Sequence, residues 1–203
     1  MNDSETADRL QTEARRLFAE LGYRGASVRA ITQAAHANLG SITYHFGSKD
    51  ALYVVVLESV FGEMSERIET AAAGEGTAAD RLIAVVKAMF AFFRETPDAP
   101  RLILHRLATG AGLPAAVRPF LRRNLTAIHV LVADGIVAGA FRPIDPTLVA
   151  FTIISQAAWF AIVGREIPTI FAGAGDPGAF PARVERHVAE VVARFVTEKG
   201  VTP

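Results

Sequence analysis

Apolar residues recur at intervals of three and four along almost the whole chain, and this spacing is the feature that most restricts the fold. A first helix is indicated by one apolar face, made of Leu10, Ala14, Leu17, Phe18 and Leu21. Gly22 follows at the place where a left-handed residue would end that helix. No alternating strand pattern competes with the helical one. The sequence therefore predicts an all-α protein of about nine helices.

Capping residues set the ends of several predicted helices. Ser27, Asn38, Ser48 and Asp145 can each accept a hydrogen bond from the first turn of a helix, and Pro146 suits a first helical position. The helices after the first are expected at about 28–35, 38–46, 49–72, 77–95, 99–109, 115–138, 146–165 and 178–198. Of the 203 residues 51% are hydrophobic, which is enough to bury a sizeable core around these helices.

Two features of the composition narrow the class of protein. The chain has no cysteine, which excludes disulfides, thiolate zinc sites and cysteine nucleophiles and permits a reducing compartment. The polar start MNDSETADRL does not read as a secretory signal. We therefore expect a cytoplasmic protein.

One uncharged run, PTLVAFTIISQAAWFAIVG at 146–164, approaches the length that spans a bilayer. It begins with proline and carries Thr152, Ser155 and Gln156. A helix this apolar on every side also suits burial among other helices or at a subunit interface. The second interpretation is favoured over membrane insertion because of the polar interruptions.

Charge is balanced overall, with 21 basic and 21 acidic residues, but it is unevenly distributed. Between Gly22 and Lys49 there are three cations and no acid. Because phosphates repel carboxylates, a nucleic-acid surface requires such local depletion of acid more than a basic chain. A chance gap on a solvated surface is the alternative.

The same segment contains two short predicted helices joined by a tight turn at His36 and Ala37. After a supporting first helix this arrangement is a helix-turn-helix, whose second helix can enter a DNA major groove. Short polar side chains there offer donors and acceptors to phosphates and base edges, and Gly40 permits close approach to the duplex. For Tyr44 and His45, partial burial against neighbouring helices is the structural alternative.

The stretch LFAELGYRGASVRAITQAAHANLGSITYHFGSKDAL, and above all GSITYHFGSKDAL, resembles the DNA-binding domain of the TetR family of bacterial transcriptional regulators. The resemblance implies a DNA-binding domain over residues 1–48, in which Ile31, Ala35, Ile42 and Phe46 form core. It further implies a set of DNA-contacting residues: Ser27, Arg29, Asn38, Leu39, Gly40, Ser41, Thr43, Tyr44, His45 and Lys49. One departure is His36, which stands where the family usually has glycine; histidine is among the residues that tolerate positive φ.

The remainder, residues 49–203, resembles the regulatory domain of that family in its helical layout and in the turn GIVAGAFRPIDP. The resemblance implies a pocket for a small, largely apolar effector. The candidate lining residues are Met89, Phe90, Phe93, His105, His129, Phe151, Gln156, Trp159 and Phe160. An aromatic stripe at helical spacing is, however, more often ordinary core.

The last two predicted helices carry more apolar surface than one small domain needs to bury, which suggests a homodimer paired as a four-helix bundle. The candidate interface residues are Leu148, Phe151, Ser155, Ala158, Ile162, Val184, Val188, Val191 and Phe195. An ordinary monomeric core is the alternative.

Among classes of function, the sequence favours a DNA-binding regulator, most simply a repressor that binds a near-palindromic operator as a dimer and is released by its effector. No nucleophile elbow, phosphate loop or paired carboxylate motif supports an enzyme, so no catalytic residue is assigned. No histidine pair or compact carboxylate cluster indicates a metal, and no cofactor is expected. A helical ligand-binding or scaffold protein without DNA readout is the alternative.

Overall fold

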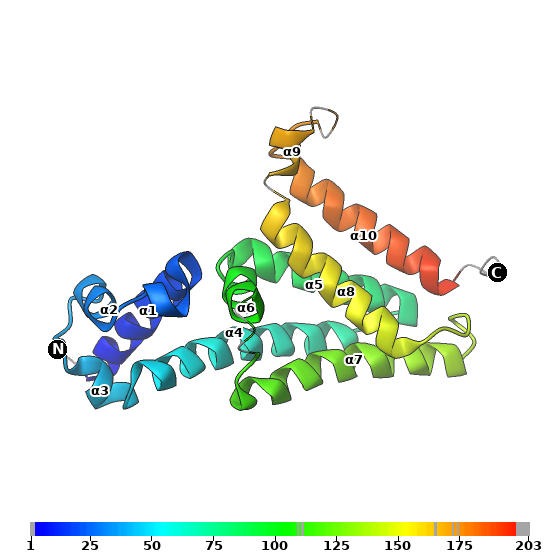
Figure 1. Cartoon of the computed structure of the whole chain (residues 1–203). Helices are drawn as coiled ribbons and strands as arrows, with labels where there is room; N and C mark the ends of the chain where they lie inside the picture. Colours follow the sequence, from blue (N-terminus) through cyan, green and yellow to red (C-terminus); the bar gives the residue numbers. More distant parts are fainter. Residues whose placement is uncertain are drawn as a thin grey trace. The chain divides into compact units, whose positions relative to one another are not determined.

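The fold is all-α, as the sequence predicts. The computed structural model describes residues 3–108, 110, 112–164, 166–171, 173 and 175–197, and these contain no strand. Its helices are shown in Figure 1 and run in this order: α1 (Asp3–Gly25), α2 (Val28–Ala34), α3 (Ser41–Phe46), α4 (Lys49–Ala72), α5 (Ala78–Glu95), α6 (Ala99–Ala108), a 3-10 turn (Ala115–Val117), α7 (Arg118–Val137), α8 (Pro146–Val163), α9 (Ile167–Ile170) and α10 (Phe180–Thr197).

Three of the four predicted N-caps are confirmed. The Ser27 hydroxyl accepts from the Ala30 amide at 3.1 Å, and the Ser48 hydroxyl accepts from the Ala51 amide at 3.0 Å. Asp145 accepts from the backbone amides of the first turn of α8. Each such cap typically stabilises a helix by about 1 kcal/mol.

The predicted cap at Asn38 is wrong. Helix α3 begins at Ser41, and its N-cap position is held by Gly40, which has no side chain to accept a hydrogen bond. Asn38 contributes only its backbone carbonyl, which accepts from the Ser41 amide at 2.9 Å. Residues 38–40 therefore form a turn that leads into α3, and the Asn38 side chain stays exposed.

Two other helix boundaries differ from the prediction. Gly22 does take a positive φ of 69°, but with ψ at 171° it makes a kink inside α1, and the helix resumes as far as Gly25. The four-residue helix α9 was not predicted, because an isolated turn around Pro168 leaves no periodic pattern.

The chain divides into two compact units. The first comprises Met1–Gly62 and Asp98–Phe120. In it α1 packs against α6 and α2, and the Arg15 guanidinium pairs with the Asp98 carboxylate at the start of α6. The rings of Phe18 and Tyr53 meet edge to face, with centroids 4.9 Å apart, so the beginning of α4 is fixed on α1.

The second unit comprises Glu63–Pro97 and Leu121–Pro203. Helix α5 is its centre and packs against both α8 and α10. The buried face of α5 includes Leu82, Val85, Val86, Met89 and Phe92. Helix α4 contributes residues to both units. The predicted functional boundary at residue 48 stays a prediction, since compactness alone does not locate a binding domain.

The turn between α2 and α3 accepts histidine in a conformation that favours glycine. His36 has a φ of 50°, the one positive φ of a non-glycine residue among those the structure describes. The turn is closed by the Ala37 amide, which donates to the Thr32 carbonyl at 2.8 Å. The side chain of His36 is exposed, so a histidine in place of the family's usual glycine disturbs no packing. The predicted tolerance of this turn for histidine is confirmed.

We expect His36→Val to lower the free energy of unfolding by about 1 to 2 kcal/mol, because a β-branched residue is strained in the left-handed region. His36→Gly should stay within about 1 kcal/mol of the parent, since glycine adopts this φ freely but is more flexible when unfolded. Urea denaturation measures both variants. Equal stability of the valine variant would contradict this account of the turn.

Candidate functional site

Helices α2 and α3 are held by one buried side. Ile31, Ala35 and Ile42 are almost completely buried, which confirms them as core, while Phe46 is half-buried. The opposite side of α3 and the turn before it face solvent, where Tyr44 and Leu39 expose 74% and 63% of their surface. These side chains are therefore accessible to a partner.

The structure places all ten predicted DNA-contacting residues in the first unit. Seven are exposed, and Ser41, His45 and Lys49 are half-buried. Five of the ten line one shallow hollow of about 530 Å³, which we call the α3 hollow. Its lining consists of Asp3, Thr6, His36, Ala37, Asn38, Gly40, Ser41, Tyr44 and His45. Which of these side chains touch DNA stays a prediction.

Lys49 is positioned by a residue that the sequence analysis missed. Its ammonium lies 4.3 Å from the centroid of the Tyr23 ring, and burial lowers the pKa of Lys49. The Tyr23 hydroxyl donates to the Asp50 carboxylate. Burial first, and then this hydrogen bond, raises the pKa of Tyr23 to about 12. The Tyr23 ring, neutral at physiological pH, therefore contacts the lysine as a cation–π partner.

An acid also lies at this surface, although the surrounding segment of sequence contains none. Asp3, at the start of α1, lines the α3 hollow, and its carboxylate accepts from the Tyr44 hydroxyl at 3.4 Å. The two residues are 41 positions apart, so only the packing of α1 could reveal the contact. A carboxylate here repels phosphate and occupies the Tyr44 hydroxyl.

The predicted effector residues are not brought together around one cavity that the structure describes. Met89, Phe90 and Phe93 are buried, and the His129 Nδ1 lies 3.2 Å from the Thr147 hydroxyl. His105 belongs to the first unit, where its exposed ring lies against Gly22. Gln156 and Phe160 are half-buried.

Phe151 and Trp159 require a correction. They expose 64% and 57% of their surface, so they cannot line an enclosed pocket within one chain. Helix α8 turns these two side chains outward because its buried side is the one that carries Val149, Ile153 and Ala157.

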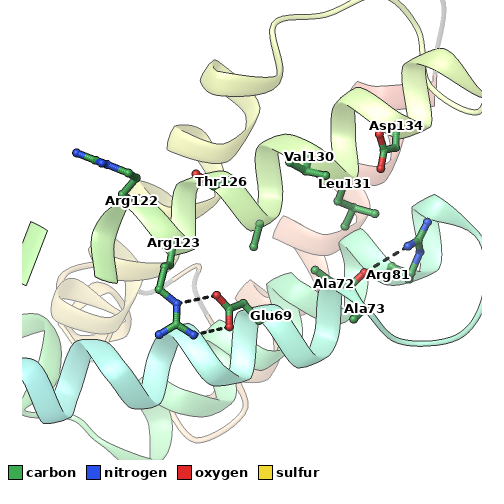
Figure 2. Close-up of a pocket in the computed structure, with 11 residues that line it drawn as sticks. Glu69, Ala72, Ala73, Arg81, Arg122, Arg123, Thr126, Val130, Leu131 and Asp134 are labelled. Atoms are coloured by element: carbon green, nitrogen blue, oxygen red, sulfur yellow. Dashed lines mark hydrogen bonds and ion pairs between the residues drawn. The ribbon is translucent and has the colours of Figure 1, made fainter. Parts of the chain in front are cut away.

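A different cavity lies where α4, α5 and α7 meet, which we call the α4–α5–α7 groove (Figure 2). It has a volume of about 470 Å³, within the range of small-molecule sites. Its lining residues are Glu69, Ala72, Ala73, Arg81, Arg122, Arg123, Thr126, Ala127, Val130, Leu131 and Asp134. None of the nine predicted effector residues is among them.

The predicted dimer residues fall into two groups. Val184 and Val188 are buried within the second unit, where α10 packs on α5, so their inclusion in an interface is corrected. The others remain at or near the surface. Leu148, Phe151, Ser155, Val191 and Phe195 are exposed, and Ala158 and Ile162 are half-buried.

Helix α8 therefore presents a largely apolar stripe to solvent, made of Leu148, Phe151 and Trp159 with Ser155 among them. By length and composition α8 could cross a membrane, and only 22% of it is buried within the chain. Among the residues that the structure describes, no group of three or more histidine and carboxylate side chains could hold a metal ion.

Comparison with known proteins identifies the family. Residues 11–56 match the model of the bacterial regulatory proteins of the tetR family. The chain is also 32% identical over 167 residues to the HTH-type transcriptional repressor Rv1474c of Mycobacterium tuberculosis, an alignment that covers 68% of this chain and 83% of that protein. The chain belongs to the TetR family.

Two further comparisons agree with this assignment. A TetR-family regulator from Rhodococcus RHA1 superposes with a TM-score of 0.77 at 20% identity, over 96% of this chain and 98% of the other, which shows the fold. The repressor AcnR of Corynebacterium efficiens is 40% identical over 55 residues, which are 27% of this chain but only 29% of AcnR. The TetR-family chain is thus a DNA-binding transcriptional regulator and not an enzyme.

In this TetR-family chain we expect Asp3→Asn to raise DNA affinity by up to about fivefold at low salt, the range of a single exposed charge interaction. The gain should shrink as salt increases, because screening weakens the repulsion that has been removed. Fluorescence anisotropy with a bound DNA fragment measures the effect. Asp8→Asn removes the same charge from α1 outside the α3 hollow and should change affinity less. Unchanged affinity of Asp3→Asn at low salt would contradict this role.

Proposed function

We propose that the chain is a cytoplasmic repressor that binds a near-palindromic operator as a homodimer and releases it when a small effector binds. The observation that carries the proposal is the exposed side of α3. Thr43 and Tyr44 on this side, and Leu39 in the turn before it, are exposed, while Ile31 and Ile42 form the core beneath.

The contacts divide by chemistry. Arg29 and Lys49 are cations suited to phosphate, and the Lys49 ammonium lies over the Tyr23 ring. Asn38, Ser41 and Thr43 carry short polar groups suited to base edges or nearby phosphates. Ser27 already accepts a backbone hydrogen bond, so its hydroxyl hydrogen remains available to a phosphate.

Gel-shift assays against genomic fragments of the source organism test DNA binding and yield the operator. On that operator, Lys49→Ala should weaken binding about evenly across sequence variants. It should also reduce the slope of log affinity against log salt by about one, because one phosphate contact is lost. Lys87→Ala removes an exposed cation from α5 in the second unit and should leave the slope unchanged. A slope equal to that of the parent would remove Lys49 from the DNA contacts.

The proposed dimer uses the exposed stripe of α8 together with Val191 and Phe195 of α10. Exposed apolar side chains in a row along one helix are typical of an interaction surface. Pairing two copies about a two-fold axis would bury the stripe in a four-helix bundle. For both copies of α3 to enter successive major grooves of the operator, they must lie about 34 to 36 Å apart, or at a multiple or modest adjustment of that spacing.

Ser155→Glu tests the dimer, because Ser155 is exposed at the centre of the stripe and the change leaves the core of a monomer intact. A carboxylate stranded in the interface should dissociate the dimer. Operator affinity should then fall by about a hundredfold or more as the second half-site contact is lost. Sedimentation and gel shift measure the two effects, with Thr70→Glu as an exposed control on α4. A dimeric Ser155→Glu protein would place the interface elsewhere.

A scaffold protein without DNA readout would be favoured if His36 distorted the turn before α3. His36 instead adopts the positive φ that the turn needs. For release by an effector, α4 offers a mechanical connection. It is a single helix of 24 residues, roughly 36 Å long, that begins at Lys49 beside the DNA-contacting residues. An effector that shifts its far end changes the DNA affinity by its own differential affinity for the two states, typically about 1 to 3 kcal/mol.

A further inference from the structure

The α4–α5–α7 groove contains a cation whose charge is not balanced. Arg81 is half-buried and forms no ion pair with any residue that the structure describes. Its Nη1 donates to the Ala72 carbonyl at 3.4 Å, and its buried Nε has no hydrogen-bond partner. Arg81 also lies in the first turn of α5, where the helix dipole adds positive potential. The guanidinium therefore has both charge and donors to offer to an anion.

The neighbouring carboxylates do not supply the missing charge. Asp80 is committed to the α5 cap, where it accepts from the Thr77 amide and hydroxyl. At the other end of the groove, Glu69 is held by a two-pronged contact with Arg123, at 2.9 and 2.6 Å (Figure 2). Asp134 lines the groove on the side of Arg81 (Figure 2), but among the described residues it forms no ion pair with that arginine.

Charge and shape together indicate the class of ligand. The groove is lined by three arginines and two carboxylates, so it carries one excess positive charge. Between its charged ends the lining is apolar, and it consists largely of Ala72, Ala73, Ala127, Val130 and Leu131. One charge suits a monoanion, and the apolar middle suits a hydrocarbon body. A phosphate dianion would meet repulsion from Glu69 and Asp134.

We propose that this groove binds a monocarboxylate with an apolar tail, and that such an acid is the effector. The carboxylate pairs with the Arg81 guanidinium, and the tail lies over Val130 and Leu131. The regulatory part of the proposal rests on the proposed repressor function, and it replaces the largely apolar effector of the sequence analysis with an amphipathic acid. Because Ala72 ends α4, a ligand here contacts the same helix that begins at Lys49.

Calorimetry with octanoate tests the site directly. Octanoate should bind the full-length protein more tightly than the neutral octanamide by about ten- to a hundredfold, the worth of charge-assisted hydrogen bonds. In the series acetate, butanoate, hexanoate and octanoate, affinity should rise by up to about fourfold per methylene buried. Equal affinity for octanoate and octanamide, or no dependence on chain length, would overturn the proposal.

Two variants locate the binding. Arg81→Met should abolish the preference for octanoate over octanamide, without lowering the Tm of the free protein, because an unpaired half-buried charge is removed. Val130→Glu places a carboxylate in the groove at a position that is 47% exposed, so the fold should stand while octanoate binding is lost. Lys87→Gln removes a cation from an exposed position on α5 outside the groove and should bind octanoate normally. Normal octanoate binding by both groove variants would place the acid elsewhere.

Operator binding distinguishes a carboxylate site from an effector site. Saturating octanoate should weaken operator affinity by about 5- to 150-fold in the parent protein and not in Arg81→Met. If octanoate binds at Arg81 but operator affinity is unchanged, the acid is not the effector and the repressor function stands. If the ligand-free protein binds no genomic fragment, the proposed function fails while the carboxylate site remains.

Discussion

The exposed side of α3, which carries the predicted DNA contacts, depends on the burial of Ile31, Ala35 and Ile42. Helix α3 has six residues, far fewer than the roughly 12 to 15 that an isolated helix needs in water. It also lacks a side-chain N-cap. Its stability and direction must therefore come from the packing of Ile42 and from the His36 turn that joins it to α2. Because buried contacts on its inner side fix α3, its exposed residues are not needed for the core and can serve recognition.

The local parts of this arrangement could be predicted from sequence. Ser27, Ser48 and Asp145 cap helices through contacts with residues two or three positions away, so the pattern contains all the information needed. Asn38 has the same chemistry, yet the backbone turns once more before α3 begins, and Gly40 takes the capping position. Competition between a turn and a cap is decided by the packing of the turn, which residue preferences do not contain.

Helical faces were harder to predict than helices. The proposed interface stripe of α10 combined Val184 and Val188, which are buried, with Val191 and Phe195, which are exposed. Periodicity identifies apolar positions, but which of them face inward depends on where α5 lies, and that is a tertiary fact. The groove was missed for a related reason, since Glu69, Arg81 and Arg123 come from three helices and form no local pattern.

The two ends of α4 show how one helix can serve opposite requirements. At its beginning, the Lys49 ammonium lies over the face of the Tyr23 ring, a contact that leaves its charge available to a phosphate. At its far end, Glu69 neutralises Arg123 while Arg81 remains unpaired. An unpaired half-buried cation is unfavourable for the free protein, and an anion that pairs with it stabilises whichever conformation holds the two together. A ligand that pairs with Arg81 can therefore favour one conformation over another, and α4, which lines the groove, is the helix whose position would change.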